Sequence, residues 1–195
     1  TTQRPRQVLE RMDAFYRHEN ANPLRGNHRL SLYATEAYEK AREHVATFIH
    51  AESPEQIIFT RNATESLNLV AYYFGLNVLK PGDEVLITRL EHHSNCVNWQ
   101  FACQRSGATL RYIELDEDYQ LDPEDFAAKL SEKTKVLAIS AASNVIATLP
   151  PVKAMIEKAH ALGVVTVLDG AQYAPHTATD VQDLGCDFFA FSGHK

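Results

Sequence analysis

The sequence predicts an α/β domain with a mostly parallel sheet and helices on both of its faces. From residue 56 onward, short apolar runs alternate with amphipathic stretches, and the connections between them are short. Several of these runs, such as residues 164–168, are apolar at nearly every position. Strands of a parallel sheet are covered on both faces and have this character, whereas half-exposed strands alternate between apolar and polar residues.

The first 55 residues have helical rather than strand spacing. Residues 6–19 place their apolar side chains on one face, and residues 32–50 carry the longest series of apolar side chains at helical spacing. The stretch between them is rich in Asn, Pro and Gly and is expected to be a loop. We therefore predict an N-terminal helical segment over residues 1–55 and an α/β domain over residues 56–195.

Turn and capping signals delimit the elements of the α/β domain. Asn62 is followed three residues later by Glu65 and then by an apolar run, which predicts a helix that starts with a capping box. Asp122 before Pro123 predicts another helix start, and Gly163 predicts the end of the last long helix. The expected strands are residues 56–60, 84–88, 109–115, 136–140, 164–168 and 186–191. The expected helices follow residue 62, cover residues 96–105, open at residue 122 and cover residues 150–162.

The composition is that of an ordinary globular chain. Its 195 residues suffice for one large domain with a core, and the net charge of −6 argues against a nucleic-acid-binding surface. The apolar runs are too short to span a bilayer. Cys96, Cys103 and Cys186 lie far apart without disulfide or metal-binding spacing, which favours a reducing compartment. We expect a cytoplasmic protein that binds no membrane; the first residue is not Met, so an organellar protein stays open.

Polar residues of chemical interest come directly after the expected strands. Ala63 and Thr64 open a helix there, where backbone N–H groups and a hydroxyl can bind an anion such as phosphate. His92, Asn144 and Asp169 each follow a different strand. Because ligands of parallel sheets bind beyond the carboxyl ends of the strands, these residues are candidates for one site. Each also has an ordinary structural interpretation, such as Asp169 capping a turn.

Lys195 follows the last apolar run and a short polar turn that contains Ser192 and His194. An amine at the edge of a core loses its proton more easily and can attack a carbonyl, and the two neighbours offer donors for an anion. The alternative is a solvated surface charge. The Glu-His-His sequence around His92 could suggest a metal site, but adjacent ligands on one element, without a partner Cys/His set, argue against it. No metal is expected.

One cofactor would use all of these groups together. Pyridoxal 5′-phosphate (PLP) needs hydrogen-bond donors for its phosphate, a carboxylate that keeps its pyridine nitrogen protonated, and a lysine for its aldehyde. Its ring also needs a stacking group, which a histidine after a strand can provide. Thr64, His92, Asp169 and Lys195 match these four needs.

Five motifs resemble those of the class V aminotransferase family, which belongs to fold type I of the PLP enzymes. Within that family they are most similar to the cysteine desulfurase/selenocysteine lyase group. The resemblance spans nearly the whole chain and implies part of the large PLP-binding domain of a fold type I transferase. The motifs are Arg61-Asn62-Ala63-Thr64-Glu65-Ser66-Leu67-Asn68-Leu69-Val70, Leu90-Glu91-His92-His93-Ser94-Asn95, Ser143-Asn144-Val145, Asp169-Gly170-Ala171-Gln172 and Ser192-Gly193-His194-Lys195.

The resemblance implies a role for each matching residue. Lys195 matches the lysine that binds the cofactor covalently and removes the substrate's α-proton. His92 matches the histidine that stacks on the pyridine ring and shuttles protons, and Asp169 matches the partner of the ring nitrogen. The groups near the ring oxygen and the substrate match Asn144 and Gln172. The phosphate binders match Ala63, through its N–H, and Thr64, Ser192 and His194.

The implied reaction converts L-cysteine to L-alanine, and the sulfur leaves as an enzyme persulfide for iron–sulfur cluster assembly. A homodimer and a sulfur-acceptor protein are the implied partners, and L-selenocysteine is an alternative substrate. The family continues well beyond the position of Lys195, where it carries the sulfur-accepting cysteine and the arginine for the substrate carboxylate. We therefore expect this sequence to be an internal piece of a longer enzyme and to be inactive alone.

Two positions depart from the pattern of the group: Leu24 stands where His is common, and Ala147 where Gly is usual. They allow a PLP-fold protein that binds a partner without catalysis. A separate alternative is another class V enzyme, such as a selenocysteine lyase, a kynureninase-like hydrolase or an epimerase. Lys195, Asp169 and His92 together argue against the non-catalytic protein, because binding alone has no use for an electron sink.

Overall fold

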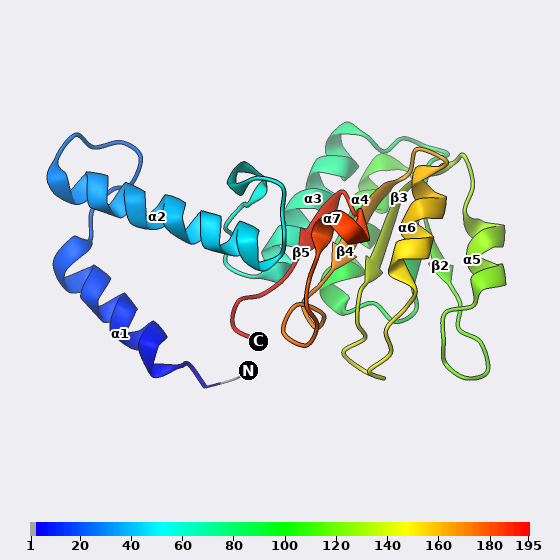
Figure 1. Cartoon of the computed structure of the whole chain (residues 1–195). Helices are drawn as coiled ribbons and strands as arrows, with labels where there is room; N and C mark the ends of the chain where they lie inside the picture. Colours follow the sequence, from blue (N-terminus) through cyan, green and yellow to red (C-terminus); the bar gives the residue numbers. More distant parts are fainter. Residues whose placement is uncertain (1–2) are drawn as a thin grey trace. The chain divides into compact units, whose positions relative to one another are not determined.

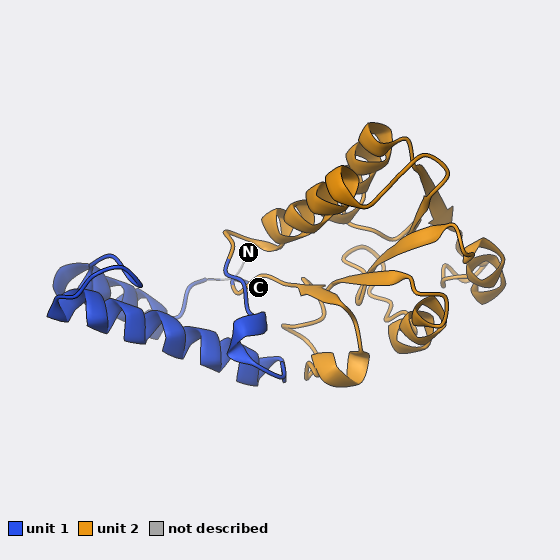
Figure 2. Ribbon diagram, turned by 90° about the horizontal axis from the view of Figure 1, so that it is seen from above, with its two compact units in different colours: residues 1–59, 194–195 blue, residues 60–193 orange. Residues whose placement is uncertain are grey.

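The computed structural model describes residues 3–195 and divides the chain into two compact units (Figure 2). The first unit consists of residues 1–59 and 194–195, and the second of residues 60–193. The first is helical, and the second contains a sheet with helices around it (Figure 1). No helix within the described part of the chain is long and apolar enough to cross a membrane.

The first unit is built on two helices. α1 (Arg6–Ala14) continues into a π-helical turn (Phe15–Glu19), and α2 (Arg29–Phe48) follows after a loop. His28 caps α2, because its Nδ1 accepts a hydrogen bond from the Ser31 N–H (3.3 Å). Both helices predicted for this part of the chain are confirmed, with α2 starting three residues earlier than expected.

The prediction of a strand at residues 56–60 is wrong. A 3-10 turn, Pro54–Gln56, leads into this stretch, and the residues after it pair with no strand in the described chain. The Ile57 carbonyl accepts a hydrogen bond from Arg42 Nη1 (2.7 Å), so a side chain occupies the place of a neighbouring strand. Ile58 is 73% exposed. A short apolar run does not by itself identify a strand, because the partner lies elsewhere in the sequence.

The second unit confirms the predicted α/β class with a parallel sheet. Its five strands are all parallel and lie in the order β2-β1-β3-β4-β5. The chain runs outward from β1 to β2 and then returns to the other side of β1, so the strand order reverses between β1 and β3. The strands are β1 (Glu84–Thr88), β2 (Thr109–Ile113), β3 (Thr134–Ser140), β4 (Val165–Asp169) and β5 (Phe188–Ala190).

Helices cover both faces of this sheet (Figures 1 and 2). α3 and α4 pack on one face around the fully buried Trp99, and α5, α6 and α7 pack on the other around Leu137 and Ile156. Burial on both faces explains why the central strands are apolar throughout. The helices are α3 (Ala63–Asn77), α4 (Val97–Ser106), α5 (Pro123–Lys129), α6 (Val152–His160) and α7 (Val181–Leu184).

The capping signals are largely confirmed. Asn62 Oδ1 accepts a hydrogen bond from the Glu65 N–H (2.9 Å), and Asp122 accepts from the two N–H groups that follow Pro123. The Glu65 carboxylate reaches back to the Arg61 N–H (2.6 Å), one residue before the expected target. Hydrogen bonds to the Asn62 and Glu65 side chains thus hold the start of α3, where the candidate anion site lies.

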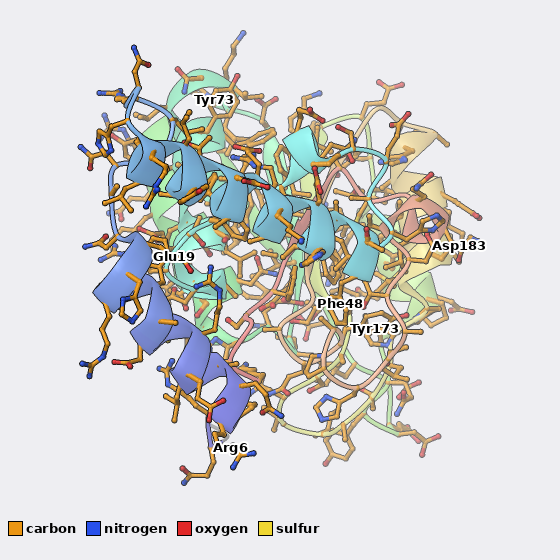
Figure 3. All side chains as sticks on the ribbon, turned by 60° about the vertical axis from the view of Figure 1, so that its left-hand side comes forward. Arg6, Glu19, Phe48, Tyr73, Tyr173 and Asp183 are labelled. Atoms are coloured by element: carbon orange, nitrogen blue, oxygen red, sulfur yellow. The ribbon has the colours of Figure 1, made fainter. Side chains whose placement is uncertain are left out.

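Three elements differ from expectation. β2 ends at Ile113, because Leu115 forms an isolated antiparallel bridge with Leu121 instead of extending the strand. β5 covers only three of the six expected residues and pairs with β4 alone. The four-residue α7 was not predicted; an ion pair between Lys153 and Asp183 joins it to α6, and Figure 3 labels Asp183.

The carboxyl ends of the central strands meet at one edge of the sheet, called here the carboxyl edge. Ser140 at the end of β3 lies beside Asp169 at the end of β4, and Asp169 lies beside Ala190 at the end of β5. β1 ends next to them at Thr88. Residues after these strands are therefore close in space although they are far apart in the sequence.

Candidate functional site

The N-terminus of α3 meets the residues after β5 at the carboxyl edge. The Ala63 N–H donates a hydrogen bond to Ser192 Oγ (3.1 Å), and both residues are buried. The Thr64 hydroxyl lies 2.7 Å from Ser94 Oγ. Backbone N–H groups at the start of a 15-residue helix, with three hydroxyls beside them, are donors of the kind that bind phosphate. The expected grouping of Ala63, Thr64 and Ser192 is present.

His92 lies after β1 in an exposed position and caps the 3-10 turn His93–Asn95. Its Nδ1 accepts a hydrogen bond from the Ser94 N–H (3.1 Å) and lies 2.9 Å from Ser94 Oγ. Since a backbone N–H can only donate, the neutral ring carries its proton on Nε2. Ser94 also contacts Thr64, so the histidine and the anion site share one hydroxyl.

Asp169 ends β4 and is only 5% exposed. Its Oδ1 accepts a hydrogen bond from the Ala171 N–H (2.9 Å), and its carbonyl accepts from the Ala141 N–H (2.9 Å). A carboxylate buried to this degree is costly unless donors or a cation accompany it. Its position at the end of a strand beside the anion site suits the protonated nitrogen of a pyridine ring.

Asn144 and Gln172 lie in the turns after β3 and β4. Asn144 is exposed, and its turn is held by Ser143 Oγ, which accepts hydrogen bonds from the Val145 and Ile146 N–H groups. Gln172 is half-buried, three residues beyond Asp169. Both residues are on the loops of the carboxyl edge, where the sequence places them.

His194 and Lys195 belong to the first unit by contacts, so chain connectivity alone relates them to this edge. Lys195 follows Ser192 by three residues, which limits the separation of their Cα atoms to roughly 11 Å. The part of the site that the second unit itself brings together contains Ala63, Thr64, His92, Asp169 and Ser192.

Sequence reasoning assigned no role to Glu91, the half-buried residue before His92. Its Oε1 accepts hydrogen bonds from Thr88 Oγ1 (2.6 Å) and the Ser140 N–H (3.0 Å), and its Oε2 accepts from Asn95 Nδ2 (2.7 Å) and Ser140 Oγ (2.8 Å). Burial raises the pKa of Glu91 to about 7, although these hydrogen bonds act in the opposite direction. The sequence signals were a carboxylate just beyond a buried strand and its place beside His92 in one of the five motifs.

Neither Cys103 nor Cys186 offers an activated thiol. Cys103 is buried, and Cys96 and Cys186 are half-buried. Burial raises the pKa of the Cys103 thiol and of the Cys186 thiol to about 11, which keeps both protonated at neutral pH. No group of three or more His, Cys, Asp or Glu side chains within residues 3–195 is arranged to hold a metal ion.

The chemistry of the carboxyl edge fits PLP. The start of α3 supplies phosphate donors, Asp169 supplies a buried carboxylate, and His92 supplies an exposed imidazole that shares Ser94 with Thr64. These groups lie at the carboxyl edge of a sheet whose strand order reverses between β1 and β3, and open α/β sheets bind ligands beyond this edge.

Known proteins share this sequence and fold. A model of the class-V aminotransferase family matches residues 1–195. A probable cysteine desulfurase of Halalkalibacterium halodurans is 51% identical over the whole chain, and a cysteine desulfurase of Pectobacterium carotovorum is 49% identical; the chain covers 48% of each. The apo structure of a cysteine desulfurase from Thermococcus onnurineus matches the whole chain and 48% of its own with a TM-score of 0.94 and 41% identity. The chain spans about half the length of the curated relatives it matches.

Proposed function

Because this chain belongs to the class-V aminotransferase family, we propose that it is part of a PLP-dependent cysteine desulfurase. The observation that carries the proposal is the carboxyl edge of the sheet. There the buried Asp169, the donors around Ala63 and the His92 ring lie on adjacent elements. Names of relatives that are 49–51% identical support the same activity.

Each candidate residue has a stated role in this proposal. The Ala63 N–H and the Thr64 and Ser192 hydroxyls bind the phosphate, with His194 beside them. Asp169 holds the proton on the pyridine nitrogen, and the His92 ring stacks on the cofactor with its Nε2 proton available for transfer. Asn144 and Gln172 contact the ring oxygen and the substrate. The Lys195 amine binds the cofactor and takes the α-proton of the substrate. The cofactor, when bound, withdraws electrons from the α-carbon.

The proposed substrate is L-cysteine, with L-selenocysteine as the alternative. An enzyme thiol removes the substrate sulfur as a persulfide, and the carbon skeleton leaves as L-alanine, so that no external oxidant or reductant is needed. We further propose a cytoplasmic homodimer that passes the sulfur to an acceptor protein for iron–sulfur cluster assembly. The proposed cofactor domain begins at residue 56, after the helical segment of residues 1–55.

Reduction with borohydride tests the cofactor lysine. The full-length protein is loaded with PLP, reduced and digested, and the pyridoxyl group is located by mass spectrometry. We expect it on Lys195 and expect K195R to carry none at that position. A label on Lys153 or Lys158 would contradict the assignment.

Product analysis tests the reaction. With L-cysteine and a thiol reductant, the full-length protein should form equal amounts of alanine and sulfide, and L-selenocysteine should give alanine and selenide. The ratio of the two kcat/KM values decides between a desulfurase and a selenocysteine lyase. PLP binding without either product would favour a different class V reaction or a protein that only binds partners.

A further inference from the structure

Glu91 joins three elements of the carboxyl edge at one carboxylate. It accepts from Thr88 at the end of β1, from Ser140 at the end of β3 and from Asn95 before α4. Asn95 is itself fully buried and oriented, because its Oδ1 accepts a hydrogen bond from Trp99 Nε1 (3.1 Å). This carboxylate links the carboxyl ends of the paired strands β1 and β3, between which the strand order reverses.

The arrangement uses the full acceptor capacity of an ionised carboxylate. Each oxygen accepts two hydrogen bonds, and all four donors are neutral. Thr88 Oγ1 accepts from the Leu90 N–H (3.0 Å), so its own proton points to Glu91. The two shortest contacts, 2.6 and 2.7 Å, have the length of charge-assisted hydrogen bonds.

The network leads to two groups of the proposed cofactor site. Glu91 directly precedes His92, so holding its carboxylate holds the start of the histidine turn. Ser140, which gives Glu91 two hydrogen bonds, is the register neighbour of Asp169. The residue after it donates its N–H to the Asp169 carbonyl. One side chain thus connects the ring-stacking group to the strand beside the ring-nitrogen partner.

We propose that Glu91 is a positioning residue for the cofactor, whose carboxylate fixes the His92 turn to the end of β3 and so sets the spacing between the His92 ring and the Asp169 carboxylate. This inference rests on the proposed function. It gives Glu91 no contact with the cofactor or the substrate. It acts through His92, the proposed stacking group for the pyridine ring, and through Asp169, the proposed partner of the ring nitrogen.

The amide variant E91Q tests this role because it cannot satisfy all four donors. The glutamine oxygen must face the Ser140 N–H, so the NH₂ group faces Asn95 Nδ2, which is also a donor. Asn95 cannot turn over without losing Trp99. The double variant E91Q/N95D restores an acceptor at position 95 for both the new amide and Trp99, and it moves the negative charge by one side chain.

The matched control is D187A at the amino end of β5. Asp187 Oδ2 accepts from the Thr166 N–H (2.8 Å), Thr166 Oγ1 (2.8 Å) and His160 Nε2 (2.9 Å), at the edge of the same sheet that is opposite to the site. Its removal destabilises the sheet without touching the His92 turn. It therefore separates a loss of stability from a loss of cofactor positioning.

The experiment uses the full-length protein and measures PLP affinity by titration and the visible absorption band of the bound cofactor. We expect E91Q to bind PLP at least tenfold more weakly with a displaced band, N95D alone to bind more weakly than wild type, and E91Q/N95D to recover to within threefold of wild type. D187A should stay within twofold of the wild-type affinity with an unchanged band. Where E91Q does not fold, S140A, which removes one of the four hydrogen bonds, should weaken PLP binding about threefold.

Several results would overturn the proposal: an unchanged affinity and band in E91Q, the same changes in D187A as in E91Q, no recovery in the double variant, or wild-type affinity in S140A when E91Q is insoluble. The proposed function fails differently. In that case the wild-type protein itself binds no PLP or gives no alanine from L-cysteine.

Discussion

Two carboxylates, Glu91 and Asp187, hold opposite edges of the same sheet, and they do so in opposite ways. Glu91 at the carboxyl edge accepts from neutral donors on both oxygens, and burial raises its pKa to about 7. Asp187 at the amino edge receives three hydrogen bonds on one oxygen. Burial is the largest single effect on Asp187 and raises its pKa, but the hydrogen bonds from Thr166 and His160 together lower it below the ordinary value.

The opposite pKa shifts of Glu91 and Asp187 have opposite consequences for the stability of the sheet. Keeping Glu91 ionised near neutral pH costs folding free energy, whereas keeping Asp187 ionised contributes to it. The costly carboxylate stands at the edge where the strand order reverses and the candidate cofactor residues gather. Strained or destabilised groups persist where the structure needs them for another purpose.

The largest expected effect comes from Asp169, the buried carboxylate at the end of β4. D169N should keep PLP bound in the full-length protein but lower kcat by two or more orders of magnitude, about 3 kcal/mol of barrier, because an amide does not hold the ring proton. Steady-state assays of alanine release measure this. Near-normal turnover would show that Asp169 only stabilises its turn and is not the partner of the ring nitrogen.

The contributions of Glu91 and Asp187 to the free energy of unfolding should change with pH in opposite directions. The folded-state pKa of Glu91 is raised, so its contribution to stability is fully present below about pH 4.5 and is lost as the pH rises through about 7. The loss is on the order of 2 kcal/mol, allowing for the part of the side chain that water reaches. The wild-type free energy of unfolding, measured in urea from pH 4.5 to 8, should fall relative to that of E91Q.

Asp187 should give the opposite slope. Its pKa is lowered, so its contribution is present above about pH 4 and is lost as the pH falls through the folded-state pKa. The same urea series at acidic pH should bring wild type and D187N together. If both carboxylates gave slopes of the same sign, the contrast between the two edges would not hold.

Removing the amino-edge carboxylate should have a smaller effect, and only on stability. D187A loses three hydrogen bonds, but 41% of the Asp187 side chain is exposed and water replaces part of them. We expect the free energy of unfolding to fall by about 1 kcal/mol, with kcat and the KM for L-cysteine unchanged. A kcat reduced beyond threefold would show that the amino edge also serves the reaction.

The sequence predicts the general location of the site because the residues after parallel strands converge. Thr64, His92 and Asp169 are predicted as site residues in this way, each from its own strand or helix start. Glu91 is not, since its importance depends on Ser140, which is 49 positions away and meets it only through the order of the strands. Local pattern shows where a strand ends, but not which side chain of another strand lies beside it.

The wrong strand at residues 56–60 has the same origin. Its apolar character is visible locally, but the Ile57 carbonyl that a ladder would need accepts a hydrogen bond from Arg42 of α2. α7 escaped prediction because four residues give no helical period to detect. In each case the missing information is a tertiary contact.

The smallest expected effect concerns Ala147, which lies in the turn after β3 with φ of +54°. This left-handed conformation costs an alanine about 1 kcal/mol, and glycine adopts it freely, so the departure from the family pattern is a matter of backbone strain rather than of an added methyl group. A147G should raise the free energy of unfolding by about 0.5 kcal/mol, because the greater entropy of glycine in the unfolded chain offsets part of the gain.

Gly163 offers the reverse experiment at the amino edge. It lies between α6 and β4 with φ of +70°, and a Cβ there would meet no atom within 4 Å, so G163A tests the backbone alone. It should lower the free energy of unfolding by about 1 kcal/mol. Equilibrium unfolding of both variants compares the free energy that glycine restores at residue 147 with the free energy that alanine loses at residue 163. If A147G instead destabilised the protein, the methyl group of Ala147 would be making a packing contact that outweighs the backbone strain. The turn would then be held by that contact rather than by the hydrogen bonds to Ser143 Oγ.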